Sequence, residues 1–142
     1  MSGALALDPG SKRIGVAGCD PLGISVKPLP FIPAKPEAEA LKRIADVVAE
    51  RGAEAVVVGL PVNMDGTEGP AAAAAREFGA RVSAALGPGV RVELWDETLT
   101  TDDAEKRLLE RGLSHRERKQ VIDSLAAAIL LKSWLDARPK SE

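Results

Sequence analysis

The stretch LALDPGSKRIGVA, residues 5–17, places two apolar runs on either side of a Pro-Gly turn. Two short apolar runs joined by such turn residues predict a β-hairpin. Asp8 ends the first run, and two cations, Lys12 and Arg13, lie across the turn. A carboxylate in this place is either a turn residue, because Asp favours the position before Pro-Gly, or a metal ligand on a rigid central strand.

The rest of the chain alternates between strand-like and helix-like patterns. A third strand is expected within residues 24–32, where prolines confine it to a sheet edge. Helical spacing begins at Pro36 and stops at Gly52, and the apolar run 55–58 is typical of a buried central strand. These patterns predict an α/β fold with a mixed, five-stranded sheet flanked by helices. The expected elements are strands 4–7, 14–19, 24–32, 55–58 and 90–95 and helices 36–52, 70–86, 100–111 and 114–135.

Composition narrows the classes of function. The 142 residues are 45% hydrophobic with a net charge of −2, which fits one domain, residues 1–138, and a short tail, residues 139–142. With Cys19 and His115 as the single cysteine and histidine, a disulfide within the chain and a Cys-rich zinc site are excluded. A bound metal is therefore expected to have oxygen ligands, which favours Mg²⁺ or Mn²⁺. No run is apolar enough for a signal peptide or a membrane span, so we expect a cytoplasmic protein without a membrane partner.

Two adjacent acids, Asp96 and Glu97, follow the last predicted strand in the segment ELWDETLTT, residues 93–101. In open α/β sheets, ligands bind at the carboxyl ends of strands, so these acids are candidates for a site. The alternative is that they precede a helix, whose N-terminus favours acidic residues.

A third acid, Asp123, lies in VIDSLAAAILL, residues 121–131. If a helix begins near Ser114, where Ser and Glu form a capping box, Asp123 is interior and shares a face with alanine and leucine. A carboxylate among apolar residues requires a cation, a hydrogen-bond partner or solvent. The alternative is that a second helix begins here with Asp123 as its N-cap.

Carboxylates from separate elements can converge on one or two magnesium ions, which activate water for phosphodiester cleavage. A basic segment, residues 106–119, carries six Lys or Arg against two Glu. It is either a solvated helix face or a patch that contacts phosphates through Arg116, Arg118 and Lys119. The sequence thus contains the elements of a metal-dependent site for nucleic acid.

Four segments together resemble the YqgF/RuvX family, in the family's order and over nearly the whole chain. The resemblance implies a ribonuclease H-like fold and the activity of a nuclease, either in 5′-end maturation of pre-16S ribosomal RNA or in Holliday junction resolution. It also implies that Asp8, Glu97 and Asp123 form the acidic, metal-binding and catalytic trio. The segments are DPGSKRIGVA (8–17), GLPVNMDGT (59–67), DETLTT (96–101) and IDSLAAAILL (122–131).

The sequence departs from the family pattern in two places. Thr98 stands where the family usually has Arg, which weakens a phosphate contact, and the opening Asp-Pro-Gly is more similar to the RuvC resolvases. In addition, many ribonuclease H-like nucleases carry the second acid on the fourth strand, which here ends in Gly-Leu-Pro. Asp65, Asp96 and Glu97 therefore all stay open as the second acid, with Glu97 favoured.

The expected function is metal-dependent hydrolysis of structured RNA or DNA. Lys12 and Arg13 are expected either to contact substrate phosphates or only to face solvent. The alternatives are a resolvase-like DNA nuclease and a ribosome-assembly factor without catalysis. An actin-like ATPase ranks last because the chain lacks a second lobe. The protein is expected to be a monomer or a homodimer, since a resolvase cuts two strands symmetrically.

Overall fold

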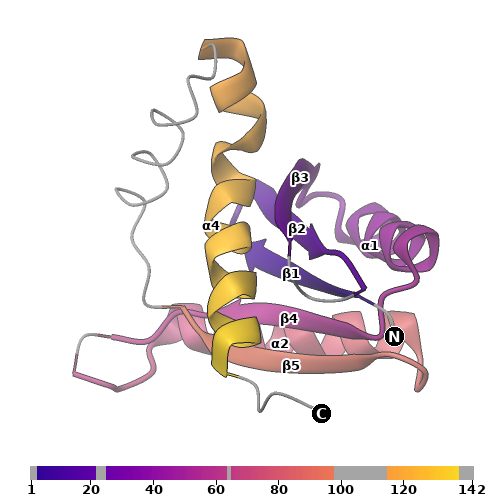
Figure 1. The fold of residues 1–142 in the computed structure, drawn as a ribbon. Coiled ribbons are helices and arrows are strands. Elements are labelled where there is room, and N and C mark those ends of the chain that lie inside the picture. Colours follow the sequence, from indigo (N-terminus) through magenta and orange to yellow (C-terminus); the bar gives the residue numbers. More distant parts are fainter. Residues whose placement is uncertain (1–2, 22–24, 64, 98–114, 138–142) are drawn as a thin grey trace.

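The computed structural model describes residues 3–21, 25–63, 65–97 and 115–137, except the side chains of residues 115–123. In this part of the chain, five strands form one sheet and three helices pack on it (Figure 1). The strands are β1 (Ala4–Pro9), β2 (Arg13–Cys19), β3 (Val26–Pro33), β4 (Ala55–Leu60) and β5 (Arg91–Asp96). The helices are α1 (Glu37–Arg51), α2 (Pro70–Leu86) and α4 (His115–Ala137).

The sheet is mixed, in the order β3-β2-β1-β4-β5. β1, β2 and β3 form an antiparallel meander, and β4 and β5 continue the sheet parallel to β1. The predicted sheet, its hairpin and the edge position of the proline-rich third strand are confirmed. β1 is longer than predicted, because Asp8 and Pro9 pair with Gly15 and Ile14 of β2. Asp8 is therefore part of the strand and not of the turn.

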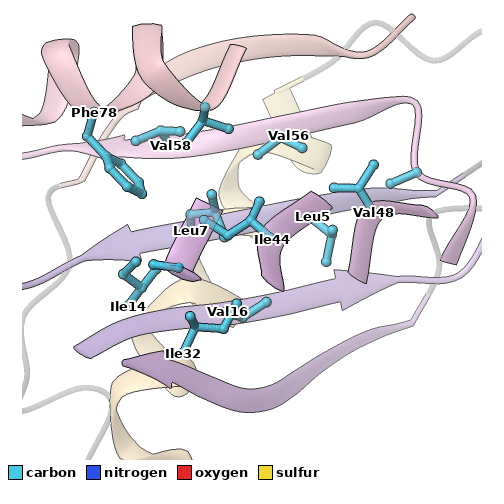
Figure 2. Close-up of a cluster of buried hydrophobic side chains, with 13 residues drawn as sticks. Leu5, Leu7, Ile14, Val16, Ile32, Ile44, Val48, Val56, Val58 and Phe78 are labelled. Carbon is cyan, nitrogen blue, oxygen red and sulfur yellow. The ribbon is translucent and has the colours of Figure 1, made fainter. Parts of the chain in front are cut away.

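Residues in each strand alternate between the two faces of the sheet, which carry different helices. Leu5 and Leu7 of β1 pack with α1 and α2, whereas Ala4 and Ala6 pack with α4. Figure 2 shows the first of these clusters, with Ile44 and Phe78 from the two helices among the labelled side chains. By the same alternation Asp8 belongs to the face that α4 covers.

The helix ends follow the local sequence. α1 ends at Arg51, and the following Gly52 adopts a left-handed φ of 63°, so that its N–H and that of Ala53 donate to carbonyls in the last turn. α2 spans Pro70–Leu86, as predicted, with proline in its first turn.

α4 crosses the sheet face opposite α1 and α2 (Figure 1). It continues unbroken from His115 to Ala137, so Asp123 is interior and the alternative of a second helix capped by Asp123 is wrong. The predicted helix 100–111 lies outside the described residues. None of the helices in the described ranges has the length and apolar character needed to cross a membrane.

Candidate active site

Two of the predicted acids, Asp8 and Glu97, are in contact although their strands are not neighbours. Asp8 lies near the end of β1, Glu97 directly follows β5, and β4 separates the two strands. The Glu97 N–H donates to the Leu60 carbonyl at 2.9 Å, which extends the β4–β5 pairing by one residue. The two carboxyl groups are hydrogen-bonded to each other. The structure thus brings together, across one strand, acids that are 89 positions apart in sequence.

The space for this contact is provided by Gly59 in β4. A Cβ atom built at Gly59 would lie 3.0 Å from Oε2 of Glu97 and 3.3 Å from Cδ2 of Leu130 in α4. The Glu97 carboxyl group therefore lies directly over the backbone of β4, on the face that α4 covers.

Burial and the acidic neighbour change the protonation of this pair. Desolvation is the largest cause, and the hydrogen bond to Asp8 and its charge add to it; together they raise the pKa of Glu97 to about 9. Near neutral pH the raised pKa therefore favours a protonated Glu97 carboxyl group beside Asp8. A divalent cation beside both groups would replace that proton and favour the doubly ionised pair.

The third predicted acid, Asp123, is placed by the backbone of α4 at the same end of the sheet. The hydroxyl of the adjacent Ser124 is fully buried and accepts a hydrogen bond of 3.1 Å from the Val16 N–H. Val16 pairs with Leu7, the residue before Asp8. This bond forms beside the irregularity in the β2–β3 pairing between Ile14 and Val16.

The side chain of Asp123 lies outside the described part of the structure, so its place in the trio stays a prediction. Among the described side chains, no group of three or more acidic, histidine or cysteine residues could hold a metal ion. Asp8 and Glu97 supply two carboxylates to the candidate site.

The geometry favours Glu97 over the two alternative acids. Asp96 pairs with Leu60 and is exposed, and strand alternation places it on the face of α1 and α2. Asp65 is exposed in the loop after β4, where it accepts hydrogen bonds from the N–H of Thr67 at 3.0 Å and its hydroxyl at 2.6 Å. These bonds lower the pKa of Asp65. Asp65 therefore has a local role in shaping its turn.

The predicted phosphate-binding cations lie in two places. Lys12 and Arg13 are exposed at the hairpin that follows Asp8, and the Arg13 guanidinium lies 5.3 Å from the ring centroid of Phe31. Gly10 is required in this hairpin, because a Cβ there would lie 2.6 Å from the Arg13 carbonyl oxygen. Thr98 is outside the described residues. Arg116, Arg118 and Lys119 lie in the first turns of α4, and their side chains are among those not described.

Sequence reasoning missed two residues next to the acids, Gly59 and Ser124. The signals were a glycine directly after the three valines of β4 and a serine on the buried side of a helix. Each signal is common in proteins, so neither residue can be assigned to the site without the tertiary contacts.

Comparison with known proteins identifies the family. Residues 2–137 match the RuvX family, described as Holliday junction resolvase. A relative from Anaeromyxobacter sp. (strain K) is 47% identical over 134 residues, covering 94% of this chain and 96% of the relative. One from Pelotomaculum thermopropionicum is 46% identical over 141 residues, covering 97% and 90%. Both relatives carry the name "Putative pre-16S rRNA nuclease".

Solved structures confirm the architecture. Thermus thermophilus RuvC in complex with a Holliday junction substrate aligns with a TM-score of 0.58 at 20% identity, covering 97% of this chain and 96% of that one. The fowlpox virus resolvase in complex with junction DNA aligns at 0.60 with 10% identity, covering 95% and 97%. These likenesses confirm the ribonuclease H-like fold. By its sequence, the chain belongs to the RuvX family, and its activity is that of a nuclease, an enzyme that hydrolyses phosphodiester bonds.

Proposed function

We propose that this nuclease uses Mg²⁺ or Mn²⁺ to process the 5′ end of pre-16S ribosomal RNA in the cytoplasm, with Asp8, Glu97 and Asp123 as its catalytic metal ligands. The observation that carries the proposal is the partly buried, hydrogen-bonded pair of Asp8 and Glu97. Two carboxyl groups held together under a helix destabilise each other when both are ionised, unless a cation lies beside them. A structural role does not require such a pair.

The donor set fits a hard divalent cation. The two contacting side chains offer oxygen atoms alone, and Asp123 would add a third carboxylate, which is the ligand chemistry of Mg²⁺ and Mn²⁺. When bound there, such an ion supplies activation of water and stabilisation of the leaving oxygen. Asp8 would hold one side of the site from a rigid strand, and Glu97 would serve as a ligand in its ionised form.

The family's relatives support RNA as the substrate, because those at 46–47% identity are named for pre-16S rRNA. Lys12 and Arg13, on the hairpin after Asp8, would contact the phosphates, together with Arg116, Arg118 and Lys119 in the first turns of α4. A Holliday junction is the second candidate substrate, favoured by the description of the family. It would require two copies of the chain to cut two strands symmetrically, whereas RNA processing needs one.

A side-by-side cleavage assay tests the proposal. End-labelled pre-16S rRNA leader and a four-way DNA junction are incubated with the full chain in Mg²⁺, Mn²⁺ or EDTA. We expect metal-dependent cleavage of the RNA, abolished in Asp8→Asn and retained in Asp96→Asn, a matched control on the other sheet face. Cleavage of the junction alone would make the chain a resolvase. Cleavage that persists in EDTA, or equal loss in both variants, would overturn the proposed metal site.

A further inference from the structure

Gly59 is an unexpected residue in an interior strand of the sheet. It lies in β4 between Val58 and Leu60, which are buried, and glycine weakens a strand interior. The described glycines with positive φ are at positions 52, 66 and 87, so Gly59 does not adopt a backbone conformation that favours glycine. The reason for a glycine here must therefore be the space that a side chain would occupy.

That space is occupied by Glu97. Because β4 lies between β1 and β5, the Glu97 side chain must cross β4 to contact Asp8. A methyl group at position 59 would lie 3.0 Å from Oε2 and 3.2 Å from Cδ of Glu97, closer than ordinary carbon contacts allow. Cδ2 of Leu130 would also lie 3.3 Å from this methyl group, so the space above Gly59 is filled by Glu97 on one side and by the helix side chain on the other.

We propose that Gly59 is a positioning residue. Because it has no side chain, it leaves the space in which the Glu97 carboxyl group lies in contact with Asp8. This inference rests on the proposed metal site and names a residue on which that site depends. Gly59 has no side chain with which to bind a metal or a substrate, so its proposed role is exerted through Glu97.

The substitution Gly59→Ala should change the position of the Glu97 carboxyl group without changing the fold. Alanine fits the backbone of β4 and is no worse than glycine in a strand interior. The added methyl group meets the end of a flexible side chain, so the Glu97 carboxyl group must shift by a few tenths of an ångström, which disturbs its contact with Asp8. The metal site then loses the geometry set by two carboxylates, while the sheet stays intact.

The test is a double-mutant cycle on Mn²⁺ affinity, measured by isothermal titration of the full chain without nucleic acid. Gly59→Ala should raise the Mn²⁺ dissociation constant about 10-fold or more, which is typical of residues that orient metal ligands. In a Glu97→Gln background the same substitution should change it less than about twofold, because no carboxylate is left to displace.

Gly18→Ala is the matched control. Gly18 also lies in a strand of this sheet, where it pairs with Leu5, and a Cβ there would lie 2.6 Å from Nε of the flexible Arg51 side chain in α1. We expect this variant to keep the Mn²⁺ affinity of the parent within about twofold, since Arg51 is not part of the proposed site.

An equal loss of affinity in the parent and in the Glu97→Gln background would overturn the inference, because the methyl group would then act through Leu130 and α4. In that case the proposed function stands, since the parent still binds Mn²⁺. A parent that does not bind Mn²⁺ would instead overturn the proposed function, and the inference with it. If Gly59→Ala does not fold, Gly59→Ala combined with Leu130→Val removes the helix contact and gives the same test.

Discussion

The two faces of the sheet are built from different kinds of side chain. On the face of α1 and α2, the strands present large aliphatic residues that pack with one another (Figure 2). On the face of α4, the same strands present mainly alanines, together with a cysteine, a valine, a glycine and an acid. The first set is Leu5, Leu7, Ile14, Val16, Ile32, Val56 and Val58, and the second is Ala4, Ala6, Asp8, Ala17, Cys19, Ala55, Val57 and Gly59.

The contacts on the two faces differ in the same way. The aliphatic face is stabilised by the burial of apolar side chains, and this hydrophobic stabilisation is non-directional. The α4 face adds directional bonds: Ser124 with the Val16 N–H at 3.1 Å, and Ser133 with Nε1 of Trp95 at 3.1 Å. Burial gives stability, whereas directional bonds fix where α4 and its residues lie. We infer that burial on both faces stabilises the fold, and that the α4 face in addition positions the candidate site.

The largest effect is expected from Asp8→Asn. Losing one carboxylate of the pair should reduce metal-dependent cleavage at least about 1,000-fold, or about 4 kcal/mol in the transition state. The rate is measured under single-turnover conditions at saturating Mn²⁺. A variant that keeps the full rate would make Asp8 a residue of the hairpin and not of a catalytic face.

Leu7→Ala changes the adjacent residue on the opposite face. Leu7 is 1% exposed in the aliphatic cluster, so truncation should lower the free energy of unfolding by about 3 kcal/mol. Urea denaturation measures this loss. Well below its melting temperature, the variant should retain the cleavage rate of the parent within a few-fold; a rate as low as that of Asp8→Asn would show that the two faces are not separable.

The acidic pair should make the metal-free protein less stable as pH rises. The pKa of Glu97 is 4.5 in the unfolded reference and about 9 in the fold, so the folded state holds an extra proton between these values. Its stabilising effect is complete below about pH 4.5 and is lost as pH rises through about 9.

Between pH 5 and pH 7 the free energy of unfolding should fall, by an amount on the order of 1 kcal/mol per pH unit, because the folded state keeps a proton that the unfolded state has lost. Urea denaturation in EDTA measures the slope, with Glu97→Gln as the control that lacks it. The same slope in both proteins would show that another group is responsible.

Smaller effects distinguish two serines of α4. Ser124→Ala leaves the buried Val16 N–H without its partner, which should lower the free energy of unfolding by about 2 kcal/mol. Ser133→Ala removes an exposed hydrogen bond to Trp95 and should cost less than about 1 kcal/mol. Urea denaturation measures both changes. Equal losses of unfolding free energy in the two variants would contradict a special role for the hydrogen bond between Ser124 and Val16.

Much of this fold can be predicted from local patterns. Alternation of leucine and alanine in β1 assigns residues to faces, prolines mark β3 as an edge strand, and Pro70 and Gly87 bracket α2. The upstream capping box correctly favoured a continuous α4 over a cap at Asp123.

The site could be predicted only in part. Asp96 and Glu97 are adjacent, so sequence alone leaves open which one faces Asp8, and the pairing of β5 with β4 is needed to choose Glu97. The roles of Gly59 and Ser124 depend on a side chain that crosses a strand and on an irregular strand pairing. These are tertiary contacts between distant segments, which local propensity does not encode.

Thermal melting of the parent and Asp8→Asn, each with and without Mn²⁺, tests the central claim most directly. If the carboxylate pair binds the ion, the melting temperature of the parent should rise with Mn²⁺ concentration, because the ion binds the folded state alone. Asp8→Asn should lose most of this response, and its metal-free form should melt no lower than the parent, because one of two facing acids is gone. A metal-free variant that melts lower than the parent and keeps the full response to Mn²⁺ would contradict the account.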